Sequence, residues 1–419
     1  MRRIFQVRLW AGEGSERSIY EEGGRRAAIT LPATSYELLD ALDKLRLEAG
    51  ASPHWRITTY HAFNDAIREK QGSLYELNAL AKKLSELDDR QKVAYDGLRM
   101  MERRTKDAPI ALSRLIDLAY STDCCHVVDK ALDDARLGQF CAEKGFVPGA
   151  KDLPDDMFAL LNFEKIGQEH RWQTGGVIVK RTTDHPGGYV ERYREPMQVY
   201  QTLELMPKEP DYVFRLRVAR GYYAPPASDC KASVQLKLPA TPETLEAVLS
   251  DLKVNDWQET VWFGLDCQIP LLTDMVYDIG VNDAFTEVWM DRLNSLAQQV
   301  ADMSPKTLTT YKALLSAVDC KNMQDAAQLV DALHDHTFSP EYGSPVEVAK
   351  GELAAILCDE ERELLEPCLD LDQYGEALIE DCGGVLTDYG LIKREDRHPV
   401  QDWEPAQDSH VHGGGMTLG

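Results

Sequence analysis

The feature that most constrains the fold is an internal similarity at an offset of 207 residues. The tetrapeptide LPAT occurs at 31–34 and again at 238–241. After each occurrence leucines recur at helical spacing, and the two predicted helices begin near Thr34 and Thr241, which are residues that favour helix N-termini. A four-residue match could arise by chance, but a shared pattern of caps and apolar positions indicates a repeat.

The similarity continues downstream at nearly the same offset. The matched pairs are Trp55 with Trp262, LNALA at 77–81 with LNSLA at 293–297, and IGQEHRWQTGGV at 166–177 with YGEALIEDCGGV at 374–385. We therefore predict two diverged copies of one module. Their predicted bounds are 1–195 and 211–395, with a connector at 196–210 and a disordered tail at 396–419.

Each predicted copy mixes short strands with a helical centre. Alternating and β-branched residues predict opening strands at 3–10 and 212–219, and capped helices follow at 34–48 and 241–253. The other elements expected in the first copy are a strand near Trp55–Tyr60, helices at 74–87, 89–103, 109–120, 133–144 and 154–170, and strands at Val177–Lys180 and Tyr189–Tyr193. Small sheets around helices predict an α+β fold rather than alternating βαβ units.

Composition excludes several classes of protein. No window approaches 18 uncharged apolar residues, so we expect no membrane span. The apolar run within the first ten residues is too short for the hydrophobic region of a secretory signal. The nine cysteines are odd in number and form no C-x-x-C pair. A disulfide framework and a zinc site are therefore disfavoured, and a cytoplasmic location is expected.

Sequence motifs for catalysis are also missing. The chain contains no G-x-S-x-G, P-loop or H-E-x-x-H pattern, and its glycine pairs at 175–176 and 383–384 precede predicted strands. The one tight Cys/His cluster is Cys124, Cys125 and His126. An enzyme that uses this cluster is one alternative, but we expect no catalytic residue, no metal and no cofactor.

Charge is distributed very unevenly along the chain. The net charge is −24; residues 1–200 hold 30 basic and 31 acidic residues, whereas residues 201–419 hold 16 and 39. Ten of the 23 residues from 359 to 381 are acidic, and only Arg362 opposes them. A solvated helix face is the ordinary explanation of such a run, but confinement to one half indicates a partner.

If mostly helical, the acidic run spans about 34 Å at ~1.5 Å per residue. It would then carry roughly one carboxylate per 3.4 Å, similar to the phosphates along one DNA strand. Pro367 and Gly375 are expected to break it into shorter helices. The predicted partner-binding acids are Asp251, Asp256, Glu259, Asp266, Asp274, Asp278, Asp283, Glu287, Asp291, Asp359, Glu360, Glu361, Glu363, Glu366, Asp370, Asp372, Glu376, Glu380 and Asp381.

The first copy resembles the ArdA family of antirestriction proteins over most of residues 1–195. The segments that carry the resemblance are LNALAKKLSELDDRQKVAYDGL at 77–98, DLAYSTDCCHVV at 117–128, DDARLGQF at 133–140, LPDDMFALLNFEKIGQEHR at 153–171, and GGVIV with GGYV at 175–190. The second copy keeps LNSLA, the acidic helix and GGV. The resemblance implies a non-enzymatic DNA mimic that occupies the DNA-binding groove of type I restriction–modification enzymes.

This chain differs from that family in its near-neutral first copy and in having two modules. The resemblance and the acidic run predict an anti-defence inhibitor in the cytoplasm of a bacterial host, carried by a phage or other mobile genetic element. Its partner would be a DNA-binding defence protein, either a restriction–modification complex or a CRISPR effector, without direct binding to nucleic acid. A homodimer or an intramolecular pseudo-dimer are both compatible with this prediction. The alternative is a protein–protein adaptor or regulator of a mobile element, which would use the neutral first copy.

Overall fold

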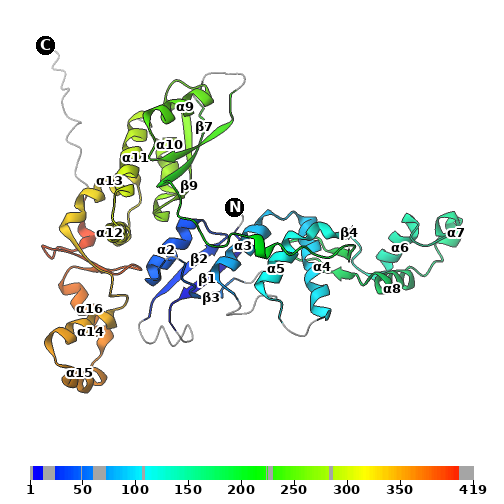
Figure 1. The fold of residues 1–419 in the computed structure, drawn as a ribbon, viewed down its shortest axis with the longest axis horizontal. Coiled ribbons are helices and arrows are strands. Elements are labelled where there is room, and N and C mark those ends of the chain that lie inside the picture. The colour runs from blue at the N-terminus through cyan, green and yellow to red at the C-terminus, as the bar shows by residue number, and fades with distance from the viewer. Residues whose placement is uncertain are drawn as a thin grey trace, which may run out of the picture. The chain divides into compact units, whose positions relative to one another are not determined.

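The structure is a computed structural model of the full chain (Figure 1). It describes residues 3–12, 24–48, 50–59, 72–105, 109–222, 224, 230–282 and 286–404. Contacts divide the chain into two units. Unit 1 comprises residues 1–9, 28–33 and 50–207, and unit 2 comprises residues 10–27, 34–49 and 208–419.

Within the described residues the fold is mixed α+β, as the sequence predicts, with fifteen α-helices and four three-stranded sheets. The N-terminal sheet has the order β2-β1-β3. Its strands are β1 (Phe5–Trp10), β2 (Arg26–Leu31) and β3 (His54–Ile57). The helices of unit 1 are α3 (Leu74–Glu86), α4 (Asp89–Thr105), α5 (Leu112–Tyr120), α6 (Asp134–Lys144), α7 (Asp155–Phe158) and α8 (Phe163–Thr174). The second sheet, of order β4-β6-β5, contains β4 (Cys125–Asp129), β5 (Val177–Val179) and β6 (Gly188–Arg192).

Helices cover both faces of the β4-β6-β5 sheet. Because successive strand residues point to opposite faces, neighbouring residues of β6 enter different cores. Val190 packs with Val93 of α4, whereas Tyr189 packs with Leu137 and Cys141 of α6. The antiparallel pairing of β6 with β4 and β5 places these side chains in register with their neighbours. The sheet therefore ties the central helix α4 to the helix pair α6–α8.

Unit 2 contains two sheets, one formed by residues 214–267 and the other by residues 336–394. The third sheet, of order β8-β7-β9, consists of β7 (Phe214–Arg220), β8 (Ser233–Leu238) and β9 (Thr260–Cys267). The fourth, of order β10-β12-β11, consists of β10 (His336–Ser339), β11 (Val385–Leu386) and β12 (Leu391–Arg394). The helices of unit 2 are α2 (Ser35–Leu45), α9 (Pro242–Leu252), α10 (Met275–Asn282), α11 (Thr286–Ala301), α12 (Pro305–Ala317), α13 (Met323–Asp331), α14 (Pro345–Ile356), α15 (Asp359–Leu365) and α16 (Leu371–Asp381). Its core surrounds Trp262, Tyr311 and Leu314, which are fully buried.

The two halves of the chain repeat the same local contacts. Asn78 of α3 exchanges two hydrogen bonds with the backbone of Ala33, at 2.8 and 3.1 Å. Asn294 of α11 does the same with Ala240, at 2.8 and 2.9 Å. These asparagines lie at the matched second position of LNALA and LNSLA, and each fixes the turn before a Thr-capped helix. A descent of both halves from one module stays a prediction.

Unit 2 includes a helix that the sequence places in the first copy. Helix α2 begins with the predicted capping box, in which Thr34 accepts from the Glu37 amide and Glu37 accepts from the Thr34 amide. Its Asp40 carboxylate is buried, where Lys312 of α12 lies 3.1 Å away, Lys44 lies 3.2 Å away, and the Tyr389 hydroxyl donates at 2.8 Å. This charged cluster therefore holds α2 within unit 2.

A single arginine adds a second connection within unit 2. The Arg25 guanidinium donates to the backbone carbonyls of Pro340 at 2.6 Å and of Tyr342 and Tyr389 at 2.9 Å each. Burial is the main reason that the pKa of Arg25 falls to about 10. Because one planar group satisfies several carbonyls, it joins the segment before β2 to the β10-β12-β11 sheet.

Two expected elements differ from the structure. The helix predicted at 154–170 is divided into α7 and α8, since the chain leaves the helical conformation before Asn162, whose side chain caps α8. Part of the segment predicted as a disordered tail is folded. Residues 400–402 form a short 3₁₀ helix, and Val400 is fully buried in the core of unit 2. Residues 405–419 lie outside the described part of the chain.

We predict that Lys312→Met destabilises the protein by about 3–5 kcal/mol, because it leaves the buried Asp40 carboxylate without its main counter-charge. The Lys312 side chain is only 3% exposed, and it contacts both Asp40 and Asp43. Urea denaturation at neutral pH measures the change. The control is Lys321→Met, which removes a surface pair with Asp319 and should cost less than about 1 kcal/mol.

The pH dependence gives an internal check on this prediction. Burial alone would raise the pKa of Asp40, but Lys312 and Lys44 outweigh it and hold that pKa below its ordinary value of 3.8. The stabilising contribution of the carboxylate is therefore complete above 3.8 and declines as the pH falls through the lower folded pKa. The difference between wild type and Lys312→Met should shrink there. An equal cost for both lysine variants at neutral pH would contradict the assigned role of Lys312.

Candidate partner-binding surface

The acidic run from 359 to 381 folds as two helices joined by one 3₁₀ turn. Cys358 is the N-cap of α15, and the Glu361 carboxylate accepts from its backbone amide at 3.1 Å. The predicted break at Pro367 is present, because this residue lies in the 3₁₀ turn at 366–368. Asp370 then caps α16, and its carboxylate accepts from the Gln373 amide at 3.1 Å. Local capping thus divides the run after Leu365.

The predicted break at Gly375 is absent, which corrects that part of the expectation. Helix α16 continues through Gly375, which is buried against α14. A Cβ atom at this position would lie 1.9 Å from the carbonyl oxygen of Pro345, a distance that no side chain tolerates. The glycine therefore serves close packing of two helices rather than termination of one. The α14–α16 pair consequently forms a fixed base for the acidic residues.

Nine of the ten carboxylates between 359 and 381 are exposed, and Glu366 is half-buried. Arg362, the one cation of this segment, lies 2.8 Å from Asp359 and 3.4 Å from Glu366. Two further carboxylates, those of Glu361 and Asp370, are used as helix caps. Six exposed acids remain in this segment with neither a pairing cation nor a capping role: Glu360, Glu363, Asp372, Glu376, Glu380 and Asp381. We call these six residues the acidic set.

Helix geometry arranges part of the acidic set in a row. Asp372, Glu376 and Glu380 are four residues apart and therefore lie on one face of α16. Successive members are separated by about 6 Å of helix rise, which is nearly twice the ~3.4 Å axial spacing of phosphates on one DNA strand. The α16 row alone is thus less dense than a DNA strand. Glu360 and Glu363 of α15 add charge beyond its N-terminal end.

Among the residues that the structure describes, the predicted acids between 251 and 291 do not form a comparable group. They lie on separate elements of unit 2, from α9 to α11. Asp251 pairs with Lys231 at 2.7 Å, Asp256 caps a 3₁₀ turn, and Glu259 accepts from the Asn255 amide at 2.7 Å. Asp274 and Asp291 are exposed. Asp283 and the side chains of Asp278 and Glu287 lie outside the described part of the structure.

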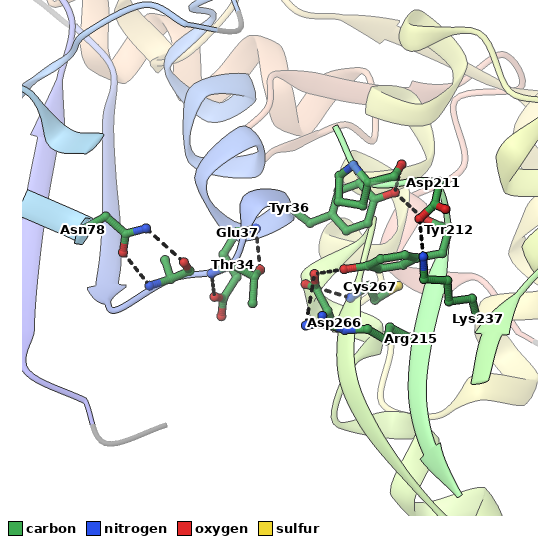
Figure 2. A network of polar contacts seen from close by, with 12 residues as sticks. Thr34, Tyr36, Glu37, Asn78, Asp211, Tyr212, Arg215, Lys237, Asp266 and Cys267 are labelled. Atoms are coloured by element: carbon green, nitrogen blue, oxygen red, sulfur yellow. Dashed lines mark hydrogen bonds and ion pairs between the residues drawn. The ribbon is translucent and has the colours of Figure 1, made fainter. Parts of the chain in front are cut away.

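Asp266 is a correction to the predicted set, because its carboxylate is buried. The Tyr212 hydroxyl donates to it at 2.7 Å, and Arg215 lies 4.0 Å away (Figure 2). The ring of Tyr36 from α2 meets Tyr212 edge-on, with centroids 5.6 Å apart, and its hydroxyl donates to the Tyr212 carbonyl. Asp266 thus supports the contact between α2 and the β8-β7-β9 sheet, and it offers no surface to a partner.

The Cys124–Cys125–His126 cluster has poor chemistry for a nucleophile. Burial raises the pKa of both thiols, so that little thiolate forms near neutral pH. The His126 ring stacks on Tyr193 at a centroid distance of 4.5 Å. Cys125 and His126 are part of β4, whose backbone pairs with β6. These contacts favour a structural role for the cluster.

In the described part of the chain, no group of three or more His, Cys, Asp or Glu residues is arranged to hold a metal ion. Among the helices that the structure describes, none combines the length and apolarity needed to cross a bilayer. No protein-family model matches the chain, and no curated protein is significantly similar to it.

Sequence reasoning missed an apolar feature beside the acidic set. Ile356, Leu364, Leu365 and Leu369 are all exposed, although aliphatic residues are usually buried in a core. Unit 1 likewise has several large exposed apolar residues, among them Phe146, Met157, Leu160 and Trp172. The sequence contains no signal for the exposure of these residues, because periodicity shows which residues share a helix face but not whether another element covers that face.

We predict that iodoacetamide at neutral pH modifies Cys358 and Cys368 well before Cys124 and Cys125. The first two thiols are exposed, whereas the second pair has raised pKa values. Mass spectrometry of tryptic peptides over a time course measures the order of labelling. Preferential early labelling of Cys125 would instead support a reactive thiol, and with it the enzyme alternative.

Proposed function

We propose that this protein is a DNA-mimic inhibitor, which occupies the DNA-binding groove of a bacterial defence enzyme through the acidic set. The observation that carries the proposal is the exposure of these six carboxylates and the lack of a pairing cation for them within their segment. They are exposed, and the only cation of their segment is held by Asp359 and Glu366. The resemblance of the first copy to the ArdA family supports a type I restriction–modification enzyme as the target class, with a CRISPR effector as the other possibility.

The physical mechanism is competition for a positively charged groove. Such a groove binds phosphates through Lys and Arg and releases counterions when it is occupied. Carboxylates on α15 and α16 would contact the same cations and would also attract the enzyme over a distance of about one Debye length. Because the α16 row is sparser than a DNA strand, charge alone gives a weaker, strongly salt-dependent complex. No catalytic group, metal or cofactor is required for this mechanism.

The test is to neutralise four members of the acidic set. The variant carries Glu360→Gln, Glu363→Gln, Asp372→Asn and Glu376→Gln, none of which alters a helix cap. With each exposed charge contributing about 0.5 kcal/mol, inhibition should weaken by roughly 10- to 100-fold at low salt. The measurement is displacement of a fluorescent duplex from a purified type I methyltransferase, repeated over a range of salt concentrations.

The matched control neutralises four exposed acids of unit 1, which lie on α6, on α8 and in the 3₁₀ turn at 150–152. Its substitutions are Glu143→Gln, Asp152→Asn, Glu164→Gln and Glu169→Gln, which change the net charge by the same amount. This control should retain near wild-type inhibition and salt dependence. Equal loss in both variants would mean that net charge, rather than the acidic set, determines binding. Undiminished inhibition in the first variant would refute the proposed role of α15 and α16.

A second candidate function is a protein–protein adaptor that binds through unit 1. The observation that favours it is the apolar group of unit 1, in which Leu160 is 84% exposed and Trp172 is 83% exposed. Isolated apolar residues on a surface are ordinary, but a Trp and a Leu that are each more than four-fifths exposed are typical of an interface. This group lies in a unit whose sequence is near neutral, so binding there would depend little on salt.

The adaptor hypothesis predicts a different response to salt. A partner captured by the chain should bind almost equally at about 50 mM and about 500 mM salt, because apolar contacts are not screened. Trp172→Ala with Leu160→Ala should weaken that complex by at least about tenfold, as expected for two contacts at the centre of an interface. Binding measured by calorimetry tests this. A complex that is lost at high salt and unaffected by these substitutions would exclude the adaptor function.

A further inference from the structure

Four exposed apolar residues lie between positions 356 and 369, interleaved along the chain with members of the acidic set. We define the apolar patch as Ile356, Leu364, Leu365 and Leu369. Ile356 is 61% exposed and Leu364 is 75% exposed, and the other two are more than two-fifths exposed. Single exposed aliphatic residues are common, but four within fourteen residues indicate an interaction surface.

The local structure accounts for this exposure. Helix α15 has only seven residues, and none of them is buried. Because α14 and α16 pack directly on each other at Gly375, their shared face is already filled. The Cys368 thiol approaches the Leu364 carbonyl at 3.7 Å, which continues the helical spacing from Leu364 and Leu365 into the 3₁₀ turn. Leu364 and Leu365 of the patch therefore lie on a short helix, whereas Ile356 is the last residue of α14 and Leu369 follows the 3₁₀ turn.

Charge around the patch restricts what can cover it. Glu360 and Glu363 share α15 with the leucines, and both are exposed. A second copy of this chain would bring the same carboxylates against these, and like charges in a desolvated interface cost binding energy. An anionic bilayer surface would be repelled for the same reason. A protein surface with an apolar centre and a Lys/Arg rim has the complementary chemistry.

We propose that the apolar patch docks on such a basic-rimmed apolar surface of the target enzyme, next to the groove that the acidic set occupies; this inference rests on the proposed function. The patch supplies what carboxylates cannot. Charge mimicry alone would attract every DNA-binding protein, whereas aliphatic contacts depend on matching shape and resist salt. The patch thereby determines which DNA-binding enzyme is inhibited, and the acidic set determines how quickly the complex forms.

The experiment compares two variants of the full chain on a purified type I methyltransferase. The variant Ile356→Ser with Leu364→Ser removes the two most exposed members of the patch, and Leu271→Ser, another exposed leucine of unit 2, is the control. Affinity is measured by fluorescence anisotropy at several salt concentrations. We expect the double variant to bind about 10- to 100-fold more weakly with an unchanged salt slope, and the control to bind like wild type.

The outcomes separate this inference from the proposed function. If the wild type displaces the duplex and the double variant does so equally well, the docking role is wrong and the DNA mimicry stands. If the wild type does not bind the enzyme at all, both are wrong. If sedimentation shows a wild-type dimer that the double variant dissociates, a second copy covers the patch and the inference is overturned. Circular dichroism confirms that the variants are folded.

Discussion

The close approach of α14 and α16 is the constraint on which the acidic surface depends. It exists because Gly375 has no Cβ, which would otherwise lie 1.9 Å from the Pro345 carbonyl oxygen. Unit 1 uses the same device, since a Cβ on Gly138 or Gly167 would meet backbone atoms of the facing helix at 1.8 and 1.9 Å. Two helices fixed at backbone contact leave little room for a third. The short helix α15 is consequently left with both its carboxylates and its leucines in solvent.

This arrangement explains why charge and apolarity occur together. In an ordinary amphipathic helix the apolar side chains are buried and the charged ones face water. In α15 neither Leu364 nor Leu365 is buried, while Glu360 and Glu363 remain exposed. Such a surface costs free energy when no partner is bound, because its apolar area is exposed to water. A partner with the complementary pattern would recover that free energy, and this is the physical reason for considering the two features as one interface.

The buried cluster around Lys312 has a different role, because it lies within the fold rather than on a surface. Burial alone would lower the pKa of Lys312, but Asp40 and Asp43 hold it above the ordinary value of 10.5. The cluster is therefore charged throughout the physiological range. It joins α2 to the core of unit 2 although more than 250 residues separate them in the chain. Local sequence patterns carry no information about such a pairing.

The amino-acid sequence alone determined several helices and their caps, because these depend on neighbouring residues. They include the Thr34–Glu37 box, Thr241 with Pro242, and the break at Pro367. It also fixed the α+β class and the excess of acids in the second half. Tertiary structure decided that Asp266 is buried, that Gly375 packs rather than breaks a helix, and that Leu364 is exposed. Each of these depends on which distant segment lies against the residue, and no spacing along the chain specifies that.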